Sequence, residues 1–256
     1  MTTTRIDPHP PTAPSGPLPS AQEPLAAEPA MHPLIRHRGR AVLAGAVLLG
    51  AGTALGLWVT AAGPQRTGEL QLDQTLAAHR DLPLTAAARF IDLALSPLGA
   101  LVVLFAICLA VALRRRLAAA VLFATTITGW FSVGADKILF ARPRPSADAV
   151  HALVQENGLD SFPSGHTGFA VALLAGILLA LRISGRSTRL AWLVGVPAVA
   201  VVALSRLYLG AHFLGDVVAS PLFVTGTVLL LAAWASPLLT GRQPAEGPAQ
   251  PIPPQR

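Results

Sequence analysis

The chain is short of charge, cysteine and lysine. Charged residues make up 12% of its 256 residues and hydrophobic residues 52%, whereas about a quarter of the residues of a soluble domain are charged. The single cysteine, Cys108, lies within an apolar stretch, which excludes an intramolecular disulfide and a cysteine-ligated zinc site. Lys137 is the only lysine, and every other cationic side chain is an arginine. The shortage of charge argues against a soluble domain.

The excess of arginine does not indicate a nucleic-acid partner. The isoelectric point is about 11.1, but the arginines lie in small groups between apolar runs and form no continuous basic face. This spacing is typical of membrane topology, so we expect membrane lipids as the surroundings and no nucleic acid. No secretory signal with a small-residue cleavage site is apparent, because the first long apolar run begins only at Ala41.

Proline concentrates at both ends of the chain. Residues 1–33 hold nine of the 23 prolines and residues 241–256 hold five more. Segments of this kind bury too little apolar surface to offset the entropy of ordering them. The sequence therefore predicts disordered cytoplasmic tails over residues 1–35 and 241–256, on either side of a membrane domain of residues 36–240.

Between the tails lie apolar runs of about the length that crosses a 30 Å hydrocarbon core as a helix. Their composition predicts an all-α fold, a polytopic membrane helical bundle with six transmembrane helices. The predicted spans are Ala41–Ala62, Ile91–Leu113, Leu117–Ala135, His166–Leu181, Leu190–Leu207 and Phe213–Leu239.

The arginines between the runs orient the bundle. Ten of them precede the first span, follow the last, or fill the second and fourth connections, against four on the other side once the motif cations are set aside. This bias places both termini in the cytoplasm. The segment Leu70–Arg89 is a candidate for a short interfacial helix on the opposite face. The alanine- and arginine-rich composition is typical of a high-GC bacterium, so we expect a bacterial plasma membrane.

Three short motifs lie at span ends on that non-cytoplasmic side. Lys137 is followed seven residues later by Arg144-Pro145, and Pro163-Ser164-Gly165-His166 opens the fourth span. Ser205-Arg206 closes the fifth span, and His212 and Asp216 follow Arg206 at spacings of six and four. The motifs and the charge bias are separate observations, and they agree.

In these motifs the chain resembles the type 2 phosphatidic acid phosphatase (PAP2) superfamily of integral-membrane lipid phosphatases, whose patterns are K-x6-R-P, P-S-G-H and S-R-x5-H-x3-D. No defined position departs from them. The resemblance implies that His212 is a nucleophile that forms a phosphohistidine and that Asp216 orients it. It further implies that His166 is the general acid toward the leaving oxygen and then the base toward water.

The same residues have the chemistry that phosphoryl transfer needs. Arg144 and Arg206 can each present a planar fork to two phosphate oxygens, and Lys137 adds a point charge. Ser164 is placed as the N-cap of a helix whose free N–H groups favour an anion, and Gly165 lets the backbone approach it. We therefore expect these five residues to bind phosphate.

The last motif pairs an imidazole with a carboxylate. His212 and Asp216 are expected on one face at the start of the last helix, one turn apart. Asp216 can then accept the N–H of one imidazole nitrogen and leave the other free to attack phosphorus.

The cations supply enough positive charge that we expect no metal and no cofactor. Nearby acidic residues match no magnesium-binding loop in their spacing and are candidates for a head-group pocket or an outer surface. They are Asp136, Asp148, Glu156 and Asp160. Arg142 precedes the motif arginine by two positions and is expected to contact a lipid head group.

The favoured function is hydrolysis of a polyprenyl (undecaprenyl-type) diphosphate on the non-cytoplasmic face. Phosphatidic acid and phosphatidylglycerophosphate are alternative substrates. Two functions of other classes use the same scaffold: a vanadium haloperoxidase, against which the six apolar runs argue, and a non-hydrolytic lipid sensor or transporter, which loss of a motif residue would favour. The sequence leaves the oligomeric state open.

Overall fold

The computed structural model describes residues 37–156 and 160–239, and every regular element in these ranges is a helix. The predicted disordered tails, residues 1–35 and 241–256, lie outside the described residues. The elements are α1 (Arg38–Ala62), α2 (Glu69–Ala78), α3 (Leu82–Ala94), α4 (Pro97–Ala112), α5 (Arg116–Phe140), α6 (Ala147–Val150), α7 (Gly165–Ile183), α8 (Arg189–Tyr208) and α9 (Leu214–Leu239).

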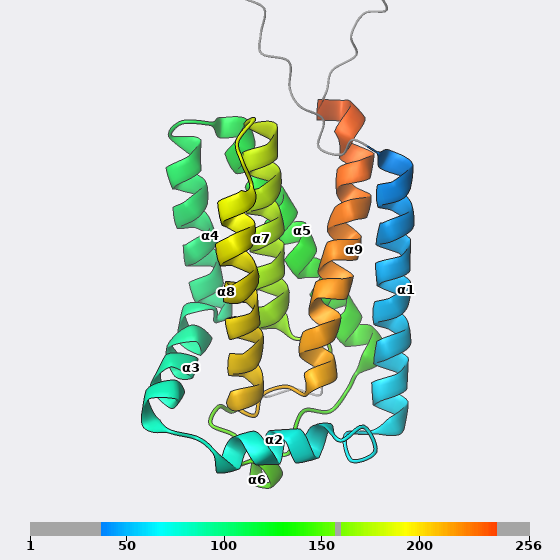
Figure 1. The fold of residues 1–256 in the computed structure, drawn as a ribbon, viewed down its shortest axis with the longest axis vertical. Coiled ribbons are helices and arrows are strands. Elements are labelled where there is room, and N and C mark those ends of the chain that lie inside the picture. The colour runs from blue at the N-terminus through cyan, green and yellow to red at the C-terminus, as the bar shows by residue number, and fades with distance from the viewer. Residues whose placement is uncertain (1–36, 157–159, 240–256) are drawn as a thin grey trace, which may run out of the picture. The chain divides into compact units, whose positions relative to one another are not determined.

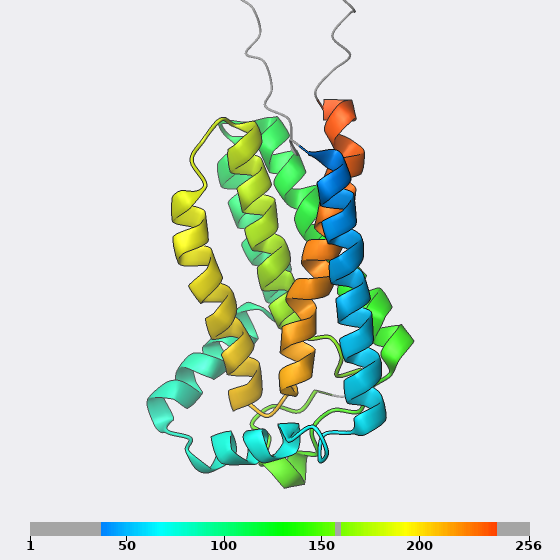
Figure 2. The ribbon, with the colours of Figure 1, turned by 45° about the vertical axis from the view of Figure 1, so that its right-hand side comes forward.

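The fold class is confirmed as a polytopic membrane helical bundle. Helices α1, α5, α7, α8 and α9 are each long and apolar enough to cross a bilayer, and the bent pair α3 and α4 would make a sixth span (Figure 1). Seen from a second direction, α8 and α9 converge at the lower end of the bundle and spread apart toward the upper end (Figure 2).

The second predicted span is not one straight helix. Within Ile91–Leu113 the chain ends α3 at Ala94, begins α4 at Pro97, and bends by 72° between them. Pro97 has no N–H to donate and restricts the residue before it, and the Ser96 side chain accepts a hydrogen bond from the N–H of Gly99 at 3.3 Å. The Ser-Pro pair therefore starts a new helix where hydrophobicity alone predicts continuity.

The predicted interfacial helix, Leu70–Arg89, is divided in the same way. Helix α2 occupies its first half and lies across the lower end of the bundle (Figure 1). Asp81 then caps α3 by accepting a hydrogen bond from the N–H of Leu84 at 2.8 Å. The second half thus belongs to the bent span.

Helix α9 packs closely against α1 because both helices carry glycine where they meet. A Cβ atom on Gly45 would come within 3.0 Å of the carbonyl oxygen of Gly226, and one on Gly52 within 3.1 Å of the Phe223 ring. Small residues at such contacts let membrane helices approach without large side chains between their backbones.

Three phenylalanine rings join the lower ends of α5 and α9 to the loop before α7. The centroid of the buried Phe162 ring lies 4.8 Å from that of Phe140 and 6.0 Å from that of Phe223. Tilted and edge-on aromatic pairs at these distances are favourable. Gly56 of α1 faces this cluster, and a Cβ atom there would lie 2.6 Å from Phe140 and 2.7 Å from Phe162.

The aromatic cluster predicts that Gly56→Leu destabilises the bundle, although leucine is the better helix former. Overpacking of this kind lowers the free energy of unfolding by about 1–3 kcal/mol. Each kcal/mol lowers the unfolding midpoint by roughly 2–4 °C in a domain of this size. Thermal unfolding in detergent measures the shift. Gly50→Leu on the same helix is the matched control, because nothing lies within 4 Å of a Cβ at Gly50. Equal midpoints for the two variants would contradict the packing argument.

Candidate active site

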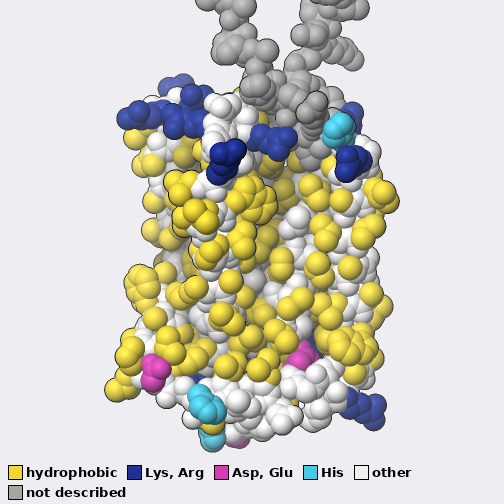
Figure 3. Space-filling view, in the orientation of Figure 1, with side chains coloured by type: hydrophobic (Ala, Val, Ile, Leu, Met, Phe, Trp, Pro, Cys, Tyr) yellow, Lys and Arg dark blue, Asp and Glu magenta, His cyan; other side chains and the backbone are white. Residues whose placement is uncertain are grey.

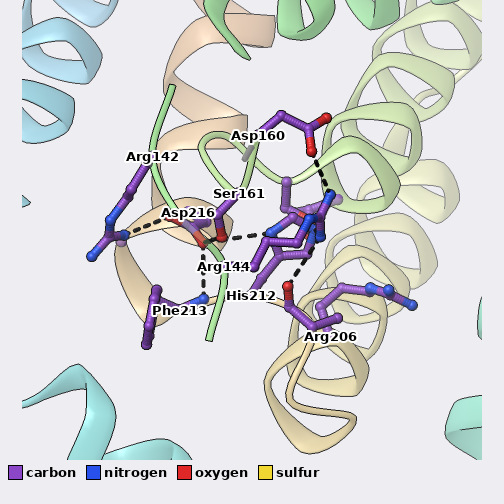
Figure 4. Close-up of polar contacts among 12 residues, drawn as sticks. Arg142, Arg144, Asp160, Ser161, Arg206, His212, Phe213 and Asp216 are labelled. Carbon is purple, nitrogen blue, oxygen red and sulfur yellow. Dashed lines mark hydrogen bonds and ion pairs between the residues drawn. The ribbon is translucent and has the colours of Figure 1, made fainter. Parts of the chain in front are cut away.

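The predicted site residues come together at the lower end of the bundle. Lys137 lies in the last turn of α5, Arg144 in the segment that follows, and His166 in the first turn of α7. Arg206 lies near the end of α8, and His212 stands in the short connection to α9. Residues spread over 76 positions of the sequence thus share one polar cluster (Figure 4).

The imidazole of His212 is buried and faces the Arg144 guanidinium. Nη1 of Arg144 lies 3.3 Å from Nε2 of His212 and donates a hydrogen bond of 3.1 Å to the carbonyl of Ala211. Only 1% of His212 is exposed. Burial lowers the pKa of His212, although Asp216 opposes the shift. The ring is therefore neutral near pH 7 and has a lone pair on one nitrogen.

Carboxylates partner the three predicted phosphate-binding cations. Glu156 bridges Arg144, at 2.5 Å, and Arg206. Asp160 lies 3.4 Å from Lys137 and 3.3 Å from Arg144. Burial would raise the pKa of Glu156, but the guanidinium groups of Arg206 and Arg144 outweigh it and lower that pKa. Lys137 and Arg144 likewise lower the pKa of Asp160 against the effect of its burial. Both carboxylates are thus ionised near pH 7 and lie where anionic phosphate oxygens would meet the same cations.

A further carboxylate, Asp92 of α3, also contacts the cluster. Its Oδ1 lies 2.5 Å from Nη1 of Arg206 and 3.5 Å from Nε2 of His166. Asp92 was not predicted from the sequence, because it lies far from every motif and inside an apolar run. The bend between α3 and α4 places it here.

The spacing of His212 and Asp216 predicted that they share one face of a helix, but in the structure they do not. Helix α9 begins at Leu214, so His212 precedes it. Oδ2 of Asp216 instead accepts a hydrogen bond of 2.9 Å from the N–H of Phe213, and this contact closes the turn. The same oxygen lies 3.5 Å from Nδ1 of His212. The imidazole and the carboxylate therefore meet through a turn, with Nε2 on the far side of the ring.

The prediction for Arg142 was wrong. Arg142 is 1% exposed, and its Nη1 forms an ion pair of 2.5 Å with Oδ1 of Asp216 (Figure 4). Its Nη2 contacts Glu69 of α2, also at 2.5 Å, and its guanidinium carbon lies 4.8 Å from the centroid of the Phe213 ring. Asp216 further accepts a hydrogen bond from the Ser161 hydroxyl. Arg142 is thus a buried partner of two carboxylates.

Helix α2 contributes two buried acidic residues to this network. Glu69 accepts a hydrogen bond of 2.7 Å from the N–H of Gly215 in the first turn of α9. Asp73, one turn further along α2, is 1% exposed, and neither of its oxygens has a hydrogen-bond partner among the described residues. Burial, with Asp216 and Glu69 nearby, raises the pKa of Asp73 to about 8, so it is mostly protonated near pH 7. Neither residue was predicted as part of the site, because α2 carries none of the motifs.

Ser164 occupies the N-cap position of α7, as predicted, but its side chain makes no capping bond. Its buried hydroxyl accepts a hydrogen bond from Thr167 at 3.2 Å, and its N–H donates to the carbonyl of Asp216 at 3.1 Å. A Cβ on Gly165 would lie 3.9 Å from Cε of Lys137. The start of α7 is therefore tied to α9 and adjoins the Lys137 side chain.

Two features bear on what else this site could hold. Ligand atoms of Asp92, Glu156 and His166 lie within 4.8 Å of one another, a separation that could hold a metal ion, although Arg206 already contacts both carboxylates. A polar cavity of about 300 Å³ adjoins Arg144 and Glu156. The site therefore has room beside its cations for part of a substrate.

Comparison with known proteins gives one family and one similar structure. The model of the PAP2 superfamily matches residues 99–240, which is more than half of the chain. No curated protein matches it. The crystal structure of the first transmembrane PAP2-type phosphatidylglycerolphosphate phosphatase, from Bacillus subtilis, has 19% sequence identity and a TM-score of 0.64, with 78% of this chain and 98% of that chain covered. At this identity the likeness concerns the fold.

The buried network predicts that Arg142→Gln strongly destabilises the protein, because Glu69 and Asp216 lose the cation between them. Removal of one partner from a buried ion pair typically costs about 3–5 kcal/mol. Thermal unfolding in detergent should show a clear drop in midpoint. Arg66→Gln is the control, since Arg66 is exposed and its side chain makes no hydrogen bond or ion pair with a described residue. An unchanged midpoint for Arg142→Gln would mean that the ion pairs contribute little.

Proposed function

The chain belongs to the PAP2 superfamily, and from this premise we propose that it is a membrane lipid phosphatase that removes the terminal phosphate of a lipid phosphate or diphosphate. The observation that supports this most is the position of His212, whose Nε2 lies 3.3 Å from Arg144 while its Nδ1 lies 3.5 Å from Asp216. An oriented nucleophile next to a cluster of cations is the arrangement that phosphoryl transfer requires.

Substrate binding places the phosphate among Lys137, Arg144 and Arg206, where it replaces the carboxylates of Glu156 and Asp160. The exchange keeps the cations paired, so little charge is left uncompensated. Charge on the equatorial oxygens increases in the transition state, and fixed guanidinium groups stabilise it. The N–H groups at the start of α7, with Ser164 and Gly165, provide further donors.

In the first chemical step Nε2 of His212 attacks phosphorus. The bond from phosphorus to the lipid oxygen breaks, and His166 donates a proton to that oxygen as it leaves. Asp216 accepts the N–H of Nδ1 and stabilises the positive charge that forms on the ring. The second step reverses these roles, because His166 takes a proton from water and the hydroxyl group displaces His212 from phosphorus. No step requires a metal.

Polyprenyl diphosphate is the favoured substrate, with phosphatidic acid and phosphatidylglycerophosphate as alternatives. The name of the similar Bacillus subtilis enzyme makes the last of these a specific candidate. The spanning helices argue against a soluble haloperoxidase, and the intact motifs argue against a non-hydrolytic sensor or transporter. Phosphate release from the three lipids by the detergent-purified protein decides among the substrates.

The metal-free mechanism predicts that activity persists in excess chelator. Loss of activity that magnesium restores would refute this mechanism.

The proposed roles of His212, Asp216 and His166 predict a different loss of activity for each variant. His212→Ala should abolish turnover and any covalent phosphoenzyme. Asp216→Asn is isosteric, but it supports the imidazole less and removes one of the two counter-charges of Arg142. Turnover should therefore fall roughly 10²–10⁴-fold, with KM nearly unchanged because the phosphate-binding cations remain. His166→Ala should slow hydrolysis of the phosphoenzyme, so that label from an activated substrate accumulates on His212. Near-normal turnover of His212→Ala, or a label that maps to His166, would refute these roles.

We also propose that the protein lies in a bacterial plasma membrane with both termini in the cytoplasm and the site outside. In a Cys108→Ala background, a cysteine introduced by Ala147→Cys should react with an impermeant thiol reagent on intact cells. One introduced by Ser187→Cys should react only after lysis. Both positions are exposed, and they lie at opposite ends of the bundle. The reverse labelling pattern would overturn the topology and the outer-leaflet substrate.

A further inference from the structure

A second cavity lies at the upper end of the bundle, away from the candidate active site. Its volume is about 470 Å³, and its walls come from α1, α7, α8 and α9. Helix α7 forms the floor, because it packs against both α8 and α9, whereas those two helices spread apart at this end (Figure 2). Most of the lining is apolar, including Leu174, Leu178, Trp192 and Val228. We refer to it as the upper groove.

The entrance of the upper groove is basic. Arg40, Arg182 and His37 line it, and none of their side chains makes a hydrogen bond or ion pair with a described residue. Every acidic residue within residues 37–156 and 160–239 belongs to α2, α3, α6, the lower ends of α5 and α9, or the loops between them. On the face seen in Figure 3, acidic side chains lie only toward the lower end, whereas cationic side chains line the upper end and also occur at the lower right. The groove therefore combines an apolar interior with a basic entrance that has no acidic partner among the described residues.

Membrane topology alone does not explain these two arginines. Arg115 and Arg186 also lie at the upper end, but they are outside the groove lining. Basic residues in short loops are sufficient to orient a membrane protein. Arg40 and Arg182 differ in that they stand at the opening of a cavity that would hold hydrocarbon.

We propose that the upper groove binds one anionic phospholipid from the adjacent leaflet. An acyl chain lies on α7 between α8 and α9, and the head-group phosphate contacts Arg40 and Arg182. This pairing matches charge with charge and apolar surface with hydrocarbon. The site is separate from the proposed phosphatase reaction and does not depend on it.

Two other occupants fit the chemistry less well. The tail of residues 1–36 adjoins His37, but it is rich in proline and has few bulky apolar residues to fill an apolar cavity. Its three acidic residues, Asp7, Glu23 and Glu28, are largely balanced by Arg5 and Arg36, so it also offers little net negative charge. A second copy of the chain would bring another cationic end against Arg40 and Arg182. An anionic lipid fits both the basic entrance and the apolar interior of the upper groove, because it carries a negative charge and a flexible hydrocarbon chain.

Trp192 makes the proposal measurable, because it lines the groove and is 54% exposed. The full chain is placed in lipid nanodiscs that contain brominated phosphatidylglycerol or brominated phosphatidylcholine with matched chains. Bromine quenches tryptophan on contact, and the difference between wild type and Trp192→Phe isolates the signal of Trp192. Half-maximal quenching should need roughly 25-fold less of the anionic lipid, because each of the two arginines contributes roughly fivefold.

The variants test whether the preference belongs to the groove. Arg40→Gln combined with Arg182→Gln should make the two lipids quench equally, while quenching by phosphatidylcholine stays at its wild-type level and reports an intact groove. Arg115→Gln combined with Arg186→Gln should keep the full preference.

Three results would overturn the proposal. The first is equal quenching by both lipids in the wild type. The second is an equal loss of preference in the Arg115 and Arg186 control, which would indicate general surface charge. The third is quenching that appears only after residues 1–30 are removed, which would show that the chain's own tail occupies the groove.

Discussion

The Asp216 carboxylate is the point at which the separate segments of the site meet. It lies 2.5 Å from Arg142, accepts hydrogen bonds from Ser161 and the N–H of Phe213, and lies 3.5 Å from His212. A buried carboxylate with this many partners has little freedom to move, because any displacement leaves a charge or a donor uncompensated. The positions of Arg142, Ser161, the start of α9 and the imidazole therefore depend on one another through a single side chain.

Sequence predicts the site in part because its chemistry is carried by short motifs. Lys137, Arg144 and Arg206 lie in one cluster with His212 and His166, as the motifs indicated, and the all-helical membrane fold follows from the apolar runs. Asp92 and Glu69 were not predicted, because their positions relative to the motifs depend on tertiary structure. The bend before Pro97 places Asp92, and the packing of α2 under the bundle places Glu69.

Spacing and residue type alone gave wrong predictions for His212 and Arg142, because the turn before α9 determines where both side chains lie. The i, i+4 spacing of His212 and Asp216 is typical of one helix face, but Asp216 caps the N–H of Phe213, so the helix begins after the histidine. Arg142 was expected at a head group, since an arginine beside a membrane usually reaches water. A buried pair of carboxylates outweighs that tendency, and neither carboxylate lies near Arg142 in the sequence.

The contact between Glu69 and the first turn of α9 has a consequence for the order of assembly. Glu69 and Arg142 are both synthesised before Gly215 and Asp216, the residues of α9 that they contact. The chain is synthesised from the N-terminus onward. Glu69, which accepts a hydrogen bond from Gly215, and Arg142, which pairs with Asp216, can therefore be in position before α9 packs against the earlier helices. Helix α9 then completes the cluster as it docks, so the proposed catalytic residues come together only after Asp216 has been synthesised.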